Sequence, residues 1–257
     1  MQLTDTWDPD TYERFRPERD RPVHDLLALL SPTDRGRAAD LGCGTGRHSP
    51  LLHERVGAAT TVGIDASERM LERRRGDAHP AVSFRHGDLA DLDGEWDVLF
   101  ANASLHWLPD HETLLPHLVG RLRRGGQLAF QVPANFDHPS HTVADRVGRD
   151  FGLAPLHRAA GSASPAGYAE ILWSAGLRDL DVTQRVYGVE MPRTDDVIAW
   201  VSGSLLTRFE AELPPDRFAE FRTAYRQQFL DELGDRDGDQ SYFYAFPRTL
   251  CWGRRPD

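Results

Sequence analysis

The stretch that most constrains this chain is 39–46, in which a short apolar run leads into three closely spaced glycines. A buried strand that passes through glycines into a helix lets backbone N–H groups approach a polar ligand at the helix N-terminus. The glycines stand at positions 42, 44 and 46, which is a G-x-G-x-G pattern. The dinucleotide fingerprint G-x-G-x-x-G has its third glycine one position later, where this chain has Arg47. The stretch therefore predicts a nucleoside-binding turn and disfavours a nicotinamide dinucleotide.

Acidic residues accompany this turn at the ends of two expected strands. Asp40 comes just before the first glycine, and Asp65 ends the next apolar segment, where a carboxylate can accept hydrogen bonds from a ribose. These features resemble the cofactor-binding half of class I S-adenosylmethionine (SAM)-dependent methyltransferases. That resemblance implies cofactor contacts from the strand ends and the glycine turn: Asp40, Gly42, Cys43, Gly44, Gly46, Asp65 and Ala66.

Composition limits the class of protein. A chain of 257 residues with 40% hydrophobic and 27% charged residues fits one α/β domain with an insertion, or one and a half domains. The two cysteines make no disulfide framework, and neither a signal peptide nor a long apolar segment is evident, so we expect a cytoplasmic protein without membrane association. A net charge of -10 argues against nucleic-acid binding. All 30 basic residues are arginine, which excludes a lysine phosphate loop and lysine Schiff-base chemistry.

The first half of the chain alternates between strand and helix patterns. Strands are expected at 37–41, 60–64, 82–86, 96–101 and 127–132. Helices are expected at 20–30, with Asp20 as N-cap, and near 46–55, 67–75 and 111–123. Such alternation predicts a mainly parallel sheet, in which ligands bind outside the carboxyl ends of the strands.

Polar residues follow the third and fourth expected strands. After the third strand, the Asp88 carboxylate can accept from an adenine amino group, and the Leu89 backbone N–H can meet the ring. After the fourth strand, the chain passes directly into a polar run that includes Asn102, His106 and Trp107. The likeness to methyltransferases implies that groups near the transferred methyl lie in this run, with Asn102 beside the cofactor.

The second half is less regular. Residues 134–165 are expected to form a loop with a short helix, 168–174 a helix, and 177–187 and 244–252 strands. Helices are expected at 195–201 and 216–233, the latter with an aromatic stripe that packs in a core: Phe218, Phe221, Tyr225 and Phe229. Together with the resemblance to class I methyltransferases, this implies an α/β fold, namely a doubly wound, mainly parallel seven-stranded sheet with an antiparallel edge strand and a helical lid. Its expected parts are a capping arm and helix at 1–32, a SAM-binding Rossmann-like core at 33–133, and residues 134–257, which complete the sheet and carry lid helices at about 190–235.

Motifs along almost the whole chain resemble the trans-aconitate 2-methyltransferase family. They include Trp7-Asp8-Pro9, Glu18-Arg19, Arg21-Pro22, Ala101-Asn102-Ala103-Ser104-Leu105, Trp107-Leu108-Pro109-Asp110-His111, Gln131-Val132-Pro133 and Ala245-Phe246-Pro247-Arg248. The chain departs from the family pattern at His106, where the family has Gln, and at Thr45, where Pro is frequent.

This resemblance implies a monomethyl ester formed on a small polycarboxylate, most simply trans-aconitate, with SAM as methyl donor and S-adenosylhomocysteine as product. A carboxylate acceptor is ionised near neutral pH and needs counter-charge rather than a base. Expected catalytic residues are His106, Trp107 and Arg248, and expected substrate contacts are Tyr12, Arg21, Trp107 and Arg248. Arg19 is expected to hold the methionine carboxylate of the cofactor.

Other functions stay open on the sequence alone. A hydroxyl acceptor on a larger metabolite would use His106 as a base, since an unperturbed imidazole pKa of about 6.5 suits that role. A nicotinamide-dependent oxidoreductase and a non-catalytic cofactor-binding protein are further alternatives. The histidines lack metal-ligand spacing, so no metal is assigned. The expected partner is a small anionic metabolite, and the expected state is a monomer or a weak homodimer.

Overall fold

The structure, a computed structural model, describes residues 16–73, 79–155, 163–236 and 240–257. The residues divide into two compact units. Of the described residues, the sheet unit comprises 21–73, 79–134, 163–185 and 248–257, and the helical unit comprises 16–20, 135–155, 186–236 and 240–247. Tyr12, which the sequence predicts to bind substrate, lies outside the described residues.

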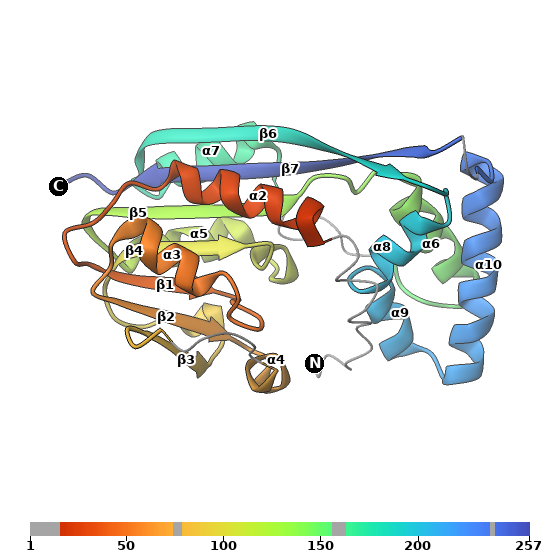
Figure 1. Cartoon of the computed structure of the whole chain (residues 1–257), viewed down its shortest axis with the longest axis horizontal. Coiled ribbons are helices and arrows are strands. Elements are labelled where there is room, and N and C mark those ends of the chain that lie inside the picture. The colour runs from red at the N-terminus through yellow and green to blue at the C-terminus, as the bar shows by residue number, and fades with distance from the viewer. Residues whose placement is uncertain (1–15, 74–78, 156–162, 237–239) are drawn as a thin grey trace. The chain divides into compact units, whose positions relative to one another are not determined.

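Seven strands form one sheet in the order β3-β2-β1-β4-β5-β7-β6. They are β1 (Arg37–Leu41), β2 (Thr60–Asp65), β3 (Val82–His86), β4 (Trp96–Asn102), β5 (Leu122–Pro133), β6 (Arg178–Met191) and β7 (Tyr242–Arg254). The first five strands pair in parallel, and β7 pairs with β5 antiparallel, which confirms the doubly wound sheet with an antiparallel strand. That antiparallel strand lies one position inside the edge, which is β6. Strand β1 lies between β2 and β4, so the strand order reverses there, and ligands of doubly wound sheets bind beside such a point (Figure 1).

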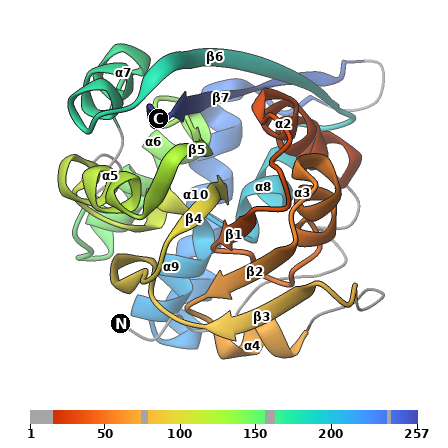
Figure 2. The same ribbon diagram turned by 90° about the vertical axis from the view of Figure 1, so that its left-hand side faces the viewer.

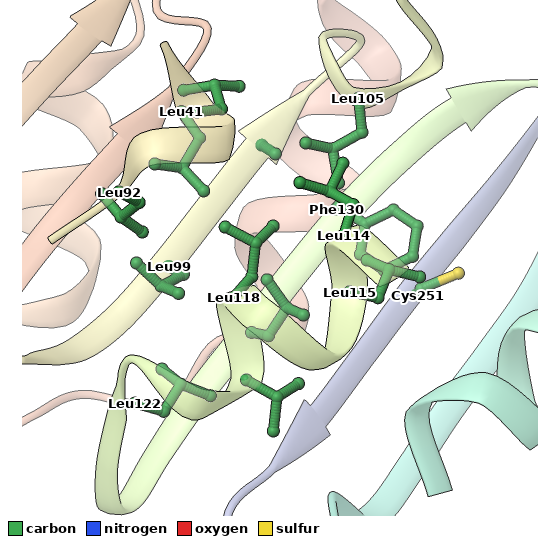
Figure 3. Close-up of a cluster of buried hydrophobic side chains, with 14 of the residues drawn as sticks. Leu41, Leu92, Leu99, Leu105, Leu114, Leu115, Leu118, Leu122, Phe130 and Cys251 are labelled. Carbon is green, nitrogen blue, oxygen red and sulfur yellow. The ribbon is translucent and has the colours of Figure 1, made fainter. Parts of the chain in front are cut away.

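Helices cover both faces of the sheet unit. The helices of the described residues are α2 (Arg16–Leu29), α3 (Ser49–Val56), α4 (Glu68–Glu72), α5 (His111–Gly120), α6 (Pro139–Asp150), α7 (Pro165–Ser174), α8 (Asp196–Ser202), α9 (Leu206–Glu212) and α10 (Pro215–Leu233), with short 3-10 turns η1 (Leu89–Asp91) and η2 (Leu105–Trp107). Helices α2 and α3 lie on one face, and α5 and α7 lie on the other (Figure 2). In Figure 3, Leu115 and Leu118 of α5 lie against Leu99 of β4 and Phe130 of β5, all fully buried. Each such side chain contributes roughly 1.5–3 kcal/mol of hydrophobic stabilisation.

Several expected boundaries are corrected. Helix α2 already runs from Arg16, so Asp20 lies inside it and is not its N-cap. Helix α3 begins at Ser49 rather than near 46, because Gly46 has a left-handed φ of +73° that no right-handed helix accommodates. Helix α5 ends at Gly120, and Leu122 already pairs with Trp96, so β5 begins five residues earlier than the expected 127.

The helical unit has its own apolar core. Residues 134–165 hold a longer helix than expected, α6, whose first turn contains Pro139 and is capped by the His138 side chain. The aromatic stripe of α10 is confirmed as core, since Phe221, Tyr225 and Phe229 are fully buried. The helices at about 190–235 lie in this unit, and their role as a lid stays a prediction. Among the described residues, no helix is long and apolar enough to cross a membrane.

Candidate active site

The glycine turn between β1 and α3 has a backbone that only glycine adopts without strain. Gly42, Gly44 and Gly46 have φ values of +69°, +57° and +73°. A Cβ on Gly42 would lie 2.2 Å from the Cβ of Ser104, and a Cβ on Gly46 would lie 2.3 Å from the Phe84 ring. The backbone N–H groups of Gly42 and Cys43 both donate to the carbonyl of Ile64, at 2.8 and 3.1 Å. The turn is therefore held closely against the end of β2, and a side chain at position 42 or 46 would overlap Ser104 or Phe84.

Asp40 lies beneath this turn and is buried, with 2% of its surface exposed. The Ser49 hydroxyl, in the first turn of α3, donates to Asp40 Oδ2 at 2.6 Å. Burial raises the pKa of Asp40 from 3.8 to about 6, the Ser49 hydrogen bond lowers it, and the charge of Asp65 raises it. The carboxyl group thus ties the end of β1 to the start of α3 and helps to position the turn between them.

Asp65, at the end of β2, binds the turn from the other side. Its Oδ2 accepts from the backbone N–H of Gly44 at 2.7 Å, and its Oδ1 accepts from the N–H of Ser67 at 2.9 Å. Each carboxylate oxygen has a further acceptor site, so the group can still accept hydrogen bonds from two vicinal hydroxyls. Ala66 follows, and its carbonyl accepts from the His86 Nε2–H at 3.0 Å.

The end of β3 contributes the third expected contact region. Asp88 caps η1, because its Oδ1 accepts from the backbone N–H of Ala90 at 2.9 Å. The Leu89 side chain is buried in the sheet-unit core, so only its backbone is in a position to meet a ligand.

The loop after β4 is docked on the glycine turn. The Ser104 hydroxyl donates to the carbonyl of Leu41 at 2.6 Å, directly beside Gly42. Ala103, just before it, has a φ of +52°, a left-handed conformation that is strained for a residue with a Cβ. His111 Nε2–H donates to the Leu105 carbonyl at 2.9 Å, and burial lowers the pKa of this histidine below 6.5. The loop is thus held at both ends, which fixes where its side chains project.

His106 and Trp107 lie in this loop, in η2. The Trp107 side chain is 54% exposed, and its ring centroid lies 4.9 Å from that of the half-buried His106. An exposed indole at the carboxyl end of a central parallel strand is unusual for an apolar side chain and can cover a bound ligand. Their expected catalytic roles stay predictions.

A row of polar side chains crosses the carboxyl ends of β4 and β5 to β7. Gln131 Nε2 donates to Asn102 Oδ1 at 2.7 Å, and Arg248 Nη1 donates to Gln131 Oε1 at 3.3 Å. Gln131 is buried, with 2% of its surface exposed. Gln131 belongs to the Gln131-Val132-Pro133 motif, but it was not among the residues predicted from the sequence to bind a ligand. Its signal was available, because a glutamine near the end of an otherwise apolar buried strand must find hydrogen-bond partners.

The two arginines predicted in the N-terminal segment belong to different units. Arg19 is in the helical unit, where its Nη2 donates to the Trp200 carbonyl at 2.6 Å and its guanidinium carbon lies 4.1 Å from the Trp200 ring centroid. Arg21 is in the sheet unit and is exposed on α2. The structure therefore brings together, within the sheet unit, the glycine turn, Asp40, Asp65, the β4 loop and Arg248.

These residues fit a nucleoside that carries hydroxyls. The turn leaves no room for side chains, Asp65 supplies acceptors for a ribose, and the loop after β4 lies beside the turn. In the described ranges, no group of His, Cys, Asp and Glu residues is arranged to hold a metal ion.

Comparisons with known proteins identify relatives of the chain. A family described as a methyltransferase domain matches residues 38–126, from β1 into β5. The trans-aconitate 2-methyltransferase of Deinococcus radiodurans is 37% identical over 260 residues, which covers 98% of this chain and 99% of the relative. The protein of the same name from Escherichia coli O1:K1 is 36% identical over 258 residues and covers 98% and 99%.

Solved structures support the fold alone. A protein from Bacillus subtilis superposes with a TM-score of 0.59 at 14% identity, covering 91% of this chain and 99% of that one. The phosphoethanolamine N-methyltransferase 2 of Haemonchus contortus, solved with S-adenosyl-L-methionine, superposes with a TM-score of 0.53 at 16% identity, covering 91% and 53%.

Proposed function

Because this chain belongs to the trans-aconitate 2-methyltransferase family, we propose that it methylates one carboxylate of a small polycarboxylate, with trans-aconitate as the first acceptor to test. The chain is a SAM-dependent methyltransferase with a Rossmann-like class I fold. The observation that carries the proposal for the acceptor is the row of Asn102, Gln131 and Arg248, which places a cation beside the loop after β4.

In this proposal, the glycine turn and Asp65 hold the nucleoside. Asp65 accepts hydrogen bonds from the ribose, and Asp88 and the Leu89 backbone take the adenine. When bound, SAM supplies an electrophilic methyl group on a sulfonium, so the chain has to align the acceptor and exclude water.

The acceptor needs no general base. A carboxyl group with an ordinary pKa of about 4 is already ionised near neutral pH. Its oxygen forms a bond to the methyl carbon as the carbon–sulfur bond breaks, the electron pair stays on sulfur, and no proton moves. His106 then acts at most as a hydrogen-bond donor, in the position where the family pattern has an amide.

Arg248 is proposed to form an ion pair with one of the acceptor's non-reacting carboxylates. The reaction neutralises the charge of the reacting carboxylate, so a tight ion pair at that group would stabilise the ground state more than the transition state. A cation on a neighbouring carboxylate binds the substrate without this penalty. This explains why a di- or tricarboxylate suits the site better than a monocarboxylate, and why a protein of net charge -10 holds an arginine there.

The test is an assay of purified protein with SAM and a matched panel of acids. We expect a monomethyl ester and an equal amount of S-adenosylhomocysteine with trans-aconitate, detected by mass spectrometry. A monocarboxylate of the same carbon skeleton should react at least about 10-fold less efficiently, because it loses a charge-assisted contact. Binding of SAM without methylation of any polycarboxylate would contradict the proposal.

A further inference from the structure

Two amides and an arginine lie in one row on one face of the sheet. In the ladder, Asn102 pairs with Gln131, and Arg248 pairs with Pro133, two residues further along β5. Side chains alternate between faces along a strand, and the same-face neighbours Phe100, Ala129 and Leu250 all belong to the core beneath α2 and α3. The three polar side chains therefore lie on the same face of the sheet as this core, just beyond it at the carboxyl ends of β4 and β5.

The direction of the hydrogen bonds in this row is set by its cationic end. A guanidinium only donates, so the group of Gln131 that faces Arg248 must be its oxygen. The Gln131 nitrogen must then face the other way, where it donates to Asn102 Oδ1 at 2.7 Å. With its oxygen occupied by that bond, the Asn102 side chain turns its NH2 group away from Gln131. The amide orientation of Asn102, two residues before Ser104, thus follows from a residue on β7.

This orientation distinguishes between classes of acceptor. An ionised carboxylate only accepts hydrogen bonds, whereas a hydroxyl acceptor also has to donate its proton to an acceptor group. A row that ends in an amide NH2 group and contains a guanidinium offers donors at both ends. It therefore favours a carboxylate over a hydroxyl or an uncharged carbonyl derivative.

We propose that Gln131 is a positioning residue that fixes the Asn102 amide with its NH2 group toward the acceptor, and that it thereby sets the selectivity of the enzyme for carboxylates. The proposal rests on the proposed function above, because it concerns how the same acceptor is chosen. Gln131 itself is buried and acts through Asn102 and Arg248.

A second glutamine on β5 serves as the matched control. Gln127 stands four positions earlier on the same face and is equally buried, with 2% of its surface exposed. Its Nε2 donates to the Ser31 carbonyl at 2.9 Å, and its Oε1 accepts from the Ser31 N–H at 2.9 Å and from Trp252 Nε1 at 3.1 Å. These partners join β5 to the segment after α2 and to β7. A substitution of Gln127 therefore disturbs a buried amide of the same strand without touching the row.

The decisive variant is Gln131→Glu. The new carboxylate still accepts from Arg248 but cannot donate to Asn102, so the Asn102 amide turns its nitrogen to position 131 and its oxygen toward the acceptor. We expect KM for trans-aconitate to rise by about 10- to 100-fold, because the variant loses a hydrogen bond to a charged group of the substrate. Because Asn102 is also expected beside the cofactor, the Kd for SAM is measured in the same variant, and KM is compared at saturating SAM.

The readout that a purely structural role would not move is selectivity. We expect the ratio of kcat/KM for trans-aconitate over its monoamide to fall at least about 10-fold in Gln131→Glu. Gln127→Glu should lower the Tm and leave this ratio unchanged. Asn102→Asp tests the other residue of the pair. Its carboxylate still accepts from Gln131 but offers the substrate a hydrogen-bond acceptor instead of a donor, so this variant should lower the ratio as well.

The outcomes separate the two proposals. If the wild-type enzyme methylates trans-aconitate and both Gln131→Glu and Asn102→Asp keep its selectivity, the role of Gln131 is wrong and the proposed function stands. If Gln127→Glu lowers the ratio as much as Gln131→Glu does, the effect is general loss of packing and the role is also wrong. If the wild-type enzyme methylates no polycarboxylate, both proposals fail.

Discussion

The two sides of the candidate site are built in different ways. On the proposed cofactor side, the central element is one continuous stretch, the glycine turn, whose shape is held by Asp40 from within it and by Asp65 from the next strand. On the acceptor side, the contacts come from Asn102, Gln131 and Arg248, which are far apart in the chain and meet only through strand pairing. The cofactor side therefore depends mainly on backbone geometry, and the acceptor side on the direction and charge of side chains.

This difference predicts how substitutions on each side should affect the binding of SAM and of the acceptor. Backbone geometry tolerates no added atoms, so small substitutions on the cofactor side should have large effects on SAM binding. A row of side chains can be altered one group at a time, so substitutions on the acceptor side should change acceptor binding and leave SAM binding intact.

The largest effect is expected from Gly42→Ala. A non-glycine residue at a φ of +69° costs about 1–2 kcal/mol, and the overlap with the Ser104 Cβ at 2.2 Å adds about 1–3 kcal/mol. We expect calorimetric titration to show SAM affinity lowered by at least about 30-fold. Gly57→Ala is the control, because Gly57 has a φ of +60° but its nearest atom lies 3.8 Å away. If Gly42→Ala binds SAM like the wild type, the turn does not hold the cofactor.

Asp40, beneath the glycine turn, should make the free energy of unfolding depend on pH. Its pKa is about 6 in the folded protein and near its ordinary 3.8 in the unfolded chain, so the folded state binds the proton more tightly. Its contribution to stability is thus full below pH 3.8 and is lost as the pH rises through 6. Relative to Asp40→Asn, the free energy of unfolding of the wild type should fall by about 3 kcal/mol across that window, measured by denaturant titration at several pH values. A difference that is constant with pH, or that rises, would show that the folded pKa of Asp40 is not raised.

Arg248→Met tests the acceptor side. Loss of a charge-assisted contact should raise KM for trans-aconitate by about 10- to 100-fold and leave the Kd for SAM within about 2-fold. Arg254→Met is the control, because Arg254 lies on the same strand and its Nη1 donates to the Gly125 carbonyl instead. Equal losses of SAM and acceptor binding would mean that the two sides are not separable in the way described above.

The smallest effect is expected from His106→Gln, which restores the residue of the family pattern. Since a carboxylate acceptor needs no base, turnover of trans-aconitate should change by less than about 3-fold, and its pH profile between 6 and 8 should keep its shape. Loss of a general base would instead lower the rate by about 100-fold or more. That larger loss would favour a hydroxyl acceptor on this chain.

The sequence located the glycine turn and its flanking aspartates more fully than the polar row of Asn102, Gln131 and Arg248, for a physical reason. The residues of a turn are adjacent in the sequence, so their spacing can be recognised there. Gly42, Asp40 and Asp65 could therefore be selected from their spacing alone. The apolar runs also located the strands, although the pairing of Leu122 with Trp96 extended β5 beyond its apolar part.

Strand pairing leaves no such local pattern. Gln131 was not selected because its partners stand 29 and 117 positions away in the chain, and nothing in its neighbourhood marks them. The role of Arg19 in cofactor binding stays a prediction, and its stacking on Trp200 could not be foreseen because Trp200 is 181 positions away in the chain. Asp20 resembled an N-cap, although helix α2 already includes Arg16 and continues through Pro22.

The contact between Ser104 and Gly42 has a consequence for anyone who wishes to redesign the acceptor preference. Because the hydroxyl of Ser104 donates to the Leu41 carbonyl and its Cβ lies close to Gly42, an enlarged residue at 104 would also displace the glycine turn, on which the proposed SAM site depends. Mutant libraries should therefore keep position 104 constant and diversify Trp107, whose exposed indole has room for replacement.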